Sequence, residues 1–326
     1  GGHPVTDITS DDNLIIKGNN LLVLHTLKKT HKEKVKLIYI DPPFYFRNSK
    51  QGDSFAYNSS FKLSTWLTFL RNRLSIAYGF LKDDGSIFVQ IDDEGYPYLR
   101  LLLDEIFGVE NYINTIHIKT LDPSGFRSTS DGLFKSTNQI LFYGKNKQKV
   151  LENIQKIYIE KSYDEMYSMY LINKEEEYSK WKWKSIKEYL AEGVYKTSVK
   201  ELVAQIGKTE LESKVAEFAI ENASSVFRTA AISGGALAKR KKTVEESKAN
   251  KGKIFVHPNE DVDDFFILNG EQIVFYGGRI VEIDGYKLPG ELVTDLWLDI
   301  PYNGISSEGG ITLTGGKKPE KLLQRI

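Results

Sequence analysis

Apolar positions along the first 144 residues follow two spacings in turn. Continuous β-branched and apolar runs predict buried strands at 35–40, 86–91, 112–118 and 139–143. Apolar residues three and four apart predict helices at 21–27, 65–80 and 96–107. Gly108 ends the last of these helices. Strands and helices in alternation are typical of an α/β domain with a largely parallel sheet.

The pattern changes after Gly144. Residues 145–250 are rich in Lys, Glu and Tyr and contain long polar stretches with helical spacing. Residues 254–283 return to short strands separated by glycine turns. We therefore expect a second segment that mixes helices with short strands. Its densest basic cluster is Lys239-Arg240-Lys241-Lys242.

The composition narrows the possible chemistry. The 326 residues include no cysteine, which excludes disulfide bonds, thiolate zinc sites and a cysteine nucleophile, and with it a cytosine-C5 methyltransferase. The 44 basic residues equal the 44 acidic residues, so DNA binding would rest on local basic patches. No apolar run approaches the roughly 18 residues of a membrane span. The five histidines show no metal-ligand spacing, and no metal site is expected.

The most informative motif is Asp41-Pro42-Pro43-Phe44, directly after the predicted strand at 35–40. Open α/β sheets bind their ligands at the carboxyl ends of strands, where the Asp41 carboxylate would lie. This carboxylate and a backbone carbonyl of the turn can accept both N–H groups of an exocyclic amine, while Phe44 stacks on its ring. An amine that attacks an electrophilic methyl group gains positive charge, which a fixed carboxylate stabilises. The same four residues would also suit a plain proline turn in which Asp41 caps a neighbouring group.

Further blocks of sequence, in a fixed order, extend beyond this motif. They lie at 13–22, 35–44, 64–74, 83–93, 103–108, 124–126, 139–146, 297–300, 308–310 and 316–320. Together they resemble β-class amino-methyltransferases, in particular the Mod subunits of type III restriction–modification systems. The resemblance covers both ends of the chain and is weak across roughly 150–270.

The resemblance implies a Rossmann-like methyltransferase sheet that uses S-adenosylmethionine to methylate adenine N6. In this family Asp-Pro-Pro-Tyr/Phe is the catalytic motif. Asp41, Pro42, Pro43 and Phe44 are therefore expected to form the target-base site, with Asp41 also close to the methionine end of the cofactor. The matching blocks also assign cofactor contacts, to Gly18, Asn19, Lys318 and Pro319.

The same resemblance implies a division of the chain and a set of partners. Residues 1–149 would form the catalytic half, 150–290 an inserted α+β target-recognition domain, and 291–326 a return to the methyltransferase domain. The expected partners are double-stranded DNA, a second copy of the chain and a restriction (Res) helicase-nuclease subunit. In this setting the cluster Lys239, Arg240, Lys241 and Lys242 would contact DNA phosphates. A bacterial cytoplasmic protein without membrane attachment is expected.

The chain departs from the family pattern in two places. Tyr45-Phe46-Arg47 follow the motif where the family usually has Asn-Thr. The glycine-rich cofactor loop, typically Phe-Ala-Gly-Ser-Gly, is expected soon after Lys318 and Pro319, yet no such loop precedes Ile326. We therefore expect a truncated methyltransferase whose sheet is incomplete and which alone binds the cofactor poorly.

Three alternatives remain open from the residues themselves. The chain could be a non-catalytic DNA-recognition part of such an enzyme. It could be a Mg²⁺-dependent nuclease that uses Asp41 with Asp92, Asp93 or Glu94, although such residues after a strand more often cap the next helix. The aromatic residues between Tyr163 and Tyr195 could stack on bases, although at helical spacing they more often belong to a core.

Overall fold

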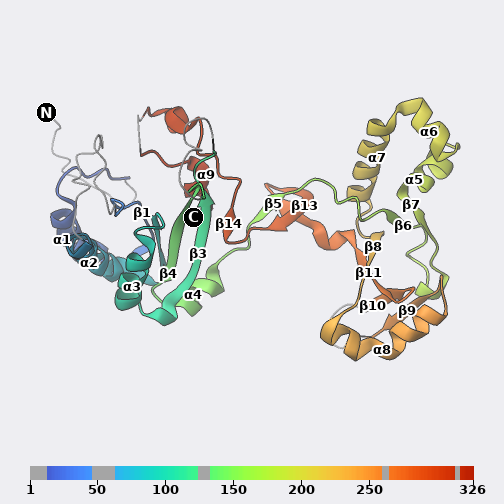
Figure 1. Cartoon of the computed structure of the whole chain (residues 1–326), viewed down its shortest axis with the longest axis horizontal. Helices are drawn as coiled ribbons and strands as arrows, with labels where there is room; N and C mark the ends of the chain where they lie inside the picture. Colours follow the sequence, from blue (N-terminus) through green and yellow to red (C-terminus); the bar gives the residue numbers. More distant parts are fainter. Residues whose placement is uncertain (1–12, 46–62, 124–132, 259–263, 313–315) are drawn as a thin grey trace. The chain divides into compact units, whose positions relative to one another are not determined.

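The computed structural model of the chain describes residues 13–45, 63–123, 133–258, 264–312 and 316–326. The chain divides into two compact units, one made of residues 1–155 with 294–326 and the other of residues 156–293 (Figure 1). No helix within the described ranges is long and apolar enough to cross a membrane. The family-like block at 124–126 and the departures at Phe46 and Arg47 lie outside these ranges.

The first unit is built on a five-stranded sheet with the order β1-β2-β4-β3-β14. Its strands are β1 (Val35–Ile40), β2 (Leu81–Ile91), β3 (Tyr112–Lys119), β4 (Thr137–Gly144) and β14 (Leu296–Trp297). The pairs β1–β2 and β3–β14 are parallel, whereas β4 runs antiparallel to both β2 and β3. The α/β class is thus confirmed, but the sheet is mixed rather than largely parallel. The sequence between β3 and β4 has no helical pattern to carry a crossover, so these strands pair as a hairpin.

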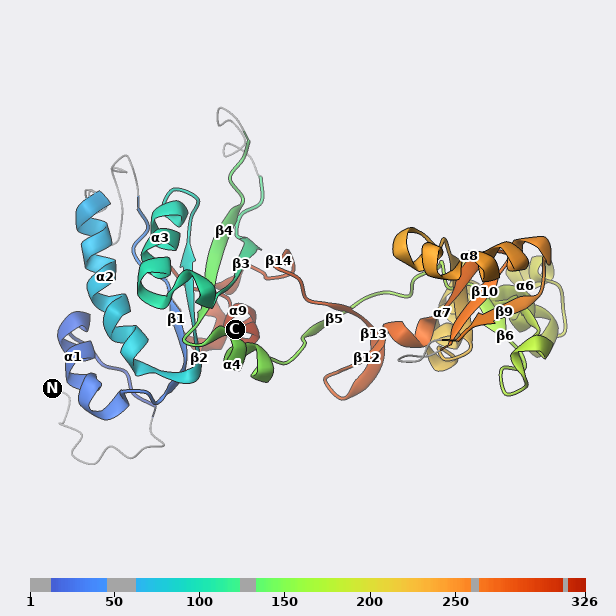
Figure 2. The same cartoon turned by 90° about the horizontal axis from the view of Figure 1, so that it is seen from below.

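The strand registers bring four strand ends to one edge of this sheet. Ile40 pairs with Val89, and Gln139 pairs with both Ile91 and His117. The carboxyl ends of β1, β2, β3 and β14 therefore lie together, beside the amino end of β4 (Figure 2). We call this the carboxyl edge of the sheet, and it is where such folds bind ligands.

The described residues of this unit also form helices, most of which bury apolar side chains. They are α1 (Asn20–His31), α2 (Leu63–Phe80), α3 (Tyr96–Phe107), α4 (Lys147–Asn153) and α9 (Glu320–Arg325), with 3₁₀ turns η1 (Val109–Asn111) and η6 (Ile305–Gly310). In α2 the buried residues Trp66, Leu70, Leu74 and Ala77 recur every three to four positions. Trp66, Leu70 and Leu74 join the residues of β2 and α3 in one core cluster, and α2 confirms the helix predicted at 65–80.

The second unit is an α+β fold of antiparallel strands. A six-stranded sheet has the order β7-β6-β8-β11-β10-β9, and a smaller one has the order β12-β13-β5. Its strands are β5 (Tyr158–Glu160), β6 (Met169–Leu171), β7 (Trp183–Ser185), β8 (Val226–Ala230), β9 (Ile254–His257), β10 (Phe265–Leu268), β11 (Glu271–Phe275), β12 (Ile280–Ile283) and β13 (Tyr286–Leu292). Its helices and turns are η3 (Tyr178–Lys180), α5 (Ile186–Glu188), the π-helix η4 (Tyr189–Val194), α6 (Val199–Ile206), α7 (Lys208–Glu221), α8 (Gly234–Ala249) and η5 (Tyr276–Arg279).

Most aromatic residues of the second unit pack inside it. Tyr167 is buried beside Tyr276, with ring centroids 4.8 Å apart. Tyr170 packs edge-on against Tyr189 at 4.7 Å, and Trp181 lies 4.8 Å from Phe266. These contacts place much of the aromatic stretch between Tyr163 and Tyr195 in the core, whereas Tyr178 and Tyr195 are exposed.

Candidate active site at the carboxyl edge of the sheet

Asp41 directly follows β1 and lies at the carboxyl edge. The turn behind it is fixed, because Pro42 is buried and the Pro43 carbonyl accepts a hydrogen bond from Trp66 Nε1 at 2.8 Å. Trp66 is fully buried in α2, so the turn is tied to the core. This bond fixes the Pro43 carbonyl, and the turn also carries the carbonyls of Asp41 and Pro42, each able to accept an N–H group.

The aromatic residues after the turn are partly buried. Phe44 and Tyr45 both pack against the core cluster of the first unit. The Tyr45 ring lies 5.7 Å from that of Trp66 and 5.9 Å from that of Tyr98. Phe44 is therefore held next to Asp41, at a position from which it could stack on a planar base.

Lys318 forms an ion pair with Asp41. Its Nζ lies 2.9 Å from Asp41 Oδ2, and the side chains are 17% and 31% exposed, respectively. The same ammonium lies 5.9 Å from the centroid of the Phe44 ring. Burial raises the pKa of the Asp41 carboxyl, and the charge and hydrogen bond of Lys318 act in the opposite direction.

A chain of polar groups, in which Gln90 is buried and Tyr39 and Tyr302 are partly buried, runs beside this ion pair. Tyr39, two residues before Asp41 on β1, donates its hydroxyl to Gln90 Oε1 at 2.6 Å. Gln90 is fully buried in β2, and its Nε2 donates to the Tyr302 hydroxyl at 3.3 Å. Burial, with the negative charge of Asp41, raises the pKa of Tyr39 far above its usual range and that of Tyr302 to about 12. Both phenols therefore stay neutral at ordinary pH and act as hydrogen-bonding groups.

A small cavity opens at the same edge, between the end of β3 and the segment after β14. Its volume is about 210 Å³. It is lined by Lys119, Thr120, Leu121, Asp122, Leu298, Asp299, Ile300, Pro301, Tyr302 and Asn303. Asn303 Nδ2 donates to Asp122 Oδ2 at 3.4 Å across it. Tyr302 thus connects this cavity to the polar chain beside Asp41.

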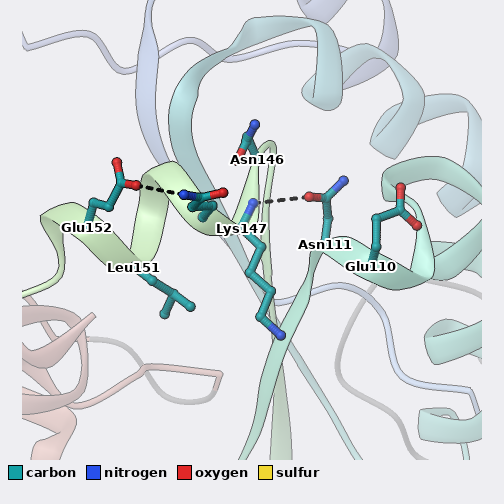
Figure 3. Close-up of a pocket in the computed structure, with 7 residues that line it drawn as sticks. Glu110, Asn111, Asn146, Lys147, Leu151 and Glu152 are labelled. Atoms are coloured by element: carbon teal, nitrogen blue, oxygen red, sulfur yellow. Dashed lines mark hydrogen bonds between the residues drawn. The ribbon is translucent and has the colours of Figure 1, made fainter.

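A larger and more open pocket of about 640 Å³ lies at the opposite edge of the sheet (Figure 3). Its lining comes from η1 and from the start of α4, where the Lys147 N–H donates to Asn111 Oδ1 at 3.0 Å. Gly144 at the end of β4 pairs with Ser86, near the start of the β2 ladder, which places this pocket away from Asp41. Its residues show no arrangement of groups that would support catalysis.

The four residues predicted to contact the cofactor lie in two different places. Asn19 caps α1, because its Oδ1 accepts the Leu21 N–H at 3.1 Å, and Gly18 precedes it. A Cβ at Gly18 would meet only Val23 Cγ2 at 3.6 Å, so nothing in the fold requires glycine there. Lys318 lies beside Asp41, and the buried Pro319 precedes α9. A role for these residues in cofactor binding stays a prediction.

The basic cluster predicted to contact DNA belongs to α8 of the second unit, and its members differ. Lys239, Lys241 and Lys242 are exposed. Arg240 instead turns toward the sheet, with its guanidinium 4.1 Å from the centroid of the Phe265 ring. Three lysines are therefore available to phosphates, while Arg240 packs against β10.

The carboxylates after β2 hold the start of α3. Asp92 Oδ1 accepts the Gly95 N–H at 3.1 Å. Lys135 Nζ lies 2.9 Å from Asp93 and 3.6 Å from Glu94. Within the described residues, no group of three or more His, Asp or Glu side chains is arranged to hold a metal ion. The capping interpretation fits these contacts.

The sequence reasoning missed Tyr39, Gln90 and Tyr302. Gln90 could have been found from the sequence, because it is a polar residue inside the apolar run at 86–91. A buried amide needs partners, and polar groups on neighbouring elements supply them. Tyr302 lies in a segment without periodicity, and nothing in the sequence singled it out.

A family model described as DNA methylase matches residues 35–271. The chain belongs to this N6/N4 DNA methylase family. The match begins at β1, includes Asp41 and continues through most of the second unit. It confirms the resemblance to amino-methyltransferases that the ordered blocks predicted.

Two Mod subunits are among the similar proteins. The probable type III restriction-modification enzyme HindVI Mod subunit of Haemophilus influenzae is 36% identical over 341 residues, which cover 98% of this chain and 44% of that protein. The type III restriction-modification enzyme StyLTI Mod subunit of Salmonella typhimurium is 33% identical over 183 residues, which cover 47% of this chain and 27% of that protein. The chain spans less than half the length of each relative.

Solved structures give a weaker likeness. The PvuII DNA methyltransferase (cytosine-N4-specific) shares 16% identity, with a TM-score of 0.30, over 40% of this chain and 48% of that one. A complex of M1.HpyAVI with SAM shares 15% identity, also with a TM-score of 0.30, over 46% of this chain and 60% of that one. At these scores they add nothing to the account of the site.

Proposed function

We propose that the chain carries the catalytic site of a type III Mod-like DNA methyltransferase, which transfers a methyl group from S-adenosylmethionine to adenine N6. One observation supports this most directly. The Asp41 carboxylate lies at the carboxyl edge, on a turn tied to the core, with Phe44 beside it. Family membership and the relatedness to Mod subunits support the same conclusion.

The site offers complementary charges to the cofactor. The amino-acid end of S-adenosylmethionine carries an ammonium and a carboxylate, and Asp41 and Lys318 present the opposite charges side by side. We propose that these two residues, with Pro319 and the Gly18-Asn19 turn, border this end of the cofactor. When bound, the cofactor supplies an electrophilic methyl group on a sulfonium.

The residues of the chain then act on the amine. Asp41 accepts one N–H of the adenine amine, a carbonyl of the proline turn accepts the other, and Phe44 stacks on the base. Methyl transfer from sulfur to the amine nitrogen would place positive charge on that nitrogen, which the Asp41 carboxylate would stabilise. The extra proton would then pass from the nitrogen to water.

The target base must leave the duplex to reach this edge. Flipping costs a few kcal/mol, which stacking in the site offsets. We propose that the second unit reads the DNA sequence, corresponding to the expected target-recognition domain at 150–290. Lys239, Lys241 and Lys242 on the exposed side of α8 would hold phosphates.

The proposed partners follow from the relatives rather than from the site. The similar Mod subunits are named as parts of type III restriction-modification enzymes. We therefore propose that the chain works with a Res helicase-nuclease subunit on double-stranded DNA, in the bacterial cytoplasm. A homodimer is proposed from the family resemblance alone.

The test is methyl transfer from labelled S-adenosylmethionine to mixed-sequence duplex DNA, measured for this chain and for a longer chain that supplies the expected glycine-rich cofactor loop. The DNA is then digested and the labelled nucleoside is identified. Label in N6-methyladenine is expected, and Asp41→Asn should lower its rate by about 100-fold or more. Asp93→Asn is the matched control, because it removes an exposed carboxylate after the neighbouring strand. Label in N4-methylcytosine would refute the choice of base. DNA binding without any label would favour a recognition role instead.

A further inference from the structure

We infer that Lys318 is a positioning residue for Asp41: its ammonium fixes one carboxylate oxygen and keeps the group ionised, so that the other oxygen can accept the target amine. The inference rests on the proposed function and assigns Lys318 a role besides cofactor binding. The ion pair uses Asp41 Oδ2 at 2.9 Å, which leaves Oδ1 for the substrate. The ion pair thereby restrains the orientation of the carboxylate before the base arrives.

The segment that carries Lys318 is anchored on its amino side by Lys317. The Lys317 ammonium donates to the carbonyl oxygens of Ser306 at 3.3 Å, of Ile311 at 2.7 Å and of Glu308. The Glu308 carboxylate in turn accepts the N–H of Glu320 at 2.9 Å. The two successive lysines thus make different contacts: Lys317 donates to backbone carbonyls in and beside η6, and Lys318 forms the ion pair with Asp41.

A second anchor lies on the carboxyl side of Lys318. Arg325 Nη1 and Nη2 donate to the two oxygens of Asp299 at 2.8 and 2.6 Å, and Lys321 Nζ lies 2.9 Å from the same carboxylate. Leu322 is fully buried on the inner side of α9. Because Asp299 lies just after β14, α9 is tied to the carboxyl edge. The backbone on both sides of Lys318 is therefore anchored, which holds its side chain beside Asp41.

Among the described residues, Lys318 is the cation whose charge and hydrogen bond lower the pKa of Asp41. The other titratable groups that face the carboxylate are Tyr39 of β1 and Tyr302 of the segment after β14. Both have a raised pKa and stay neutral at ordinary pH, and Gln90 between them carries no charge. Burial favours the protonated acid, so removal of Lys318 leaves burial unopposed.

A protonated Asp41 would be a poorer partner for the amine. The neutral acid has lost one acceptor site and no longer supplies the negative charge that the developing ammonium needs. The proposal therefore predicts that the acid limb of the rate profile, and the protonation midpoint of Asp41, both depend on a positive charge at position 318.

The experiment follows the Asp41 carboxyl directly by NMR in the chain labelled in aspartate carboxyl carbons. Its signal is assigned by its loss in Asp41→Asn. Lys318→Met should raise the pH at which Asp41 is half protonated. Lys318→Arg keeps the positive charge, so its Asp41 midpoint should stay close to that of the unmodified chain. Lys321→Met is the matched control, because it removes the same charge from the same segment while Arg325 still holds Asp299. The control midpoint should not move.

Methyl transfer as a function of pH gives the second measurement. On the acid side of the profile, each unit of upward movement lowers the rate by about tenfold. The inference would be overturned if Asp41 had the same protonation midpoint in the unmodified chain and in Lys318→Met. Should Lys318→Met fail to fold, as judged by its thermal transition, Lys318→Gln takes its place under the same criterion. A midpoint that moves in a chain without methyl transfer would uphold the positioning role and count against the proposed function.

Discussion

The hydrogen bond from Trp66 to the Pro43 carbonyl makes a demanding test of the site, because it joins the catalytic turn to the core. Trp66→Phe keeps an aromatic ring in α2 and removes the indole N–H that donates at 2.8 Å. The side chain is fully buried, so the substitution also leaves a small cavity beside Tyr45.

The size of the effect can be worked from these contacts. Loss of the hydrogen bond costs about 1 kcal/mol, and loss of part of the buried ring costs about 1–2 kcal/mol. The free energy of unfolding should therefore fall by about 2–3 kcal/mol, which leaves a protein of ordinary stability folded. Movement of the turn by a fraction of an ångström should lower the rate of methyl transfer by about tenfold or more.

The stability assay is urea unfolding followed by circular dichroism, and the functional assay is methyl transfer at saturating DNA. Trp181→Phe is the matched control, since its indole N–H donates to the Glu176 carbonyl at 2.8 Å in the second unit. It should cost a similar or smaller amount of stability and leave transfer rates nearly unchanged. An unimpaired rate in Trp66→Phe, or equal rate losses in the two variants, would show that the turn does not depend on this bond.

Four further substitutions test other parts of the structure. Gln90→Met leaves the partly buried hydroxyls of Tyr39 and Tyr302 without their shared partner and should lower the free energy of unfolding by about 2 kcal/mol, measured by urea unfolding. Asp299→Asn should lower the melting temperature at neutral pH, and the difference should shrink as the pH falls. The pKa of Asp299 is held well below its usual range by Arg325 and Lys321, so its contribution exists above the unfolded-state value and disappears on acidification. Lys242→Ala should reduce the slope of log affinity for DNA against log salt by about 0.9 if it neutralises one phosphate, whereas Arg240→Ala should mainly lower stability.

The sequence predicted the strands and helices of the first unit well, because each of them has a local hydrophobic pattern. The runs at 35–40 and 139–143 became β1 and β4, and the helical spacing at 65–80 became α2. Among the strands, the largest difference in a boundary is at β2, which begins at Leu81 and not at residue 86. The ladder explains this, because Val35 pairs with Leu81 and Leu37 with Ser86, so that residues 82–85 form an irregularity within the strand.

The second unit was predicted only in outline. Its short strands pair across long stretches of sequence, as β6 does with β8 and β11 with β8, and such pairing depends on contacts that no local pattern records. The basic cluster shows the same limit at the level of one residue. Four consecutive positions of a helix point in different directions, so Arg240 packs on Phe265 while its neighbours remain exposed.

The candidate site shows where sequence reasoning from local patterns ends. Asp41 could be found because a carboxylate and two prolines interrupt an apolar run. Tyr302 could not, because it meets Gln90 across a separation of 212 residues. The intervening second unit leaves β4 and β14 attached to the same sheet, and β14 pairs with β3 through two residues only. This short pairing, together with the anchors of α9, places Tyr302 and Lys318 at the carboxyl edge. The chemistry of Asp41 therefore depends on the correct docking of the last segment, and variants that loosen α9 should impair methyl transfer before they unfold the sheet.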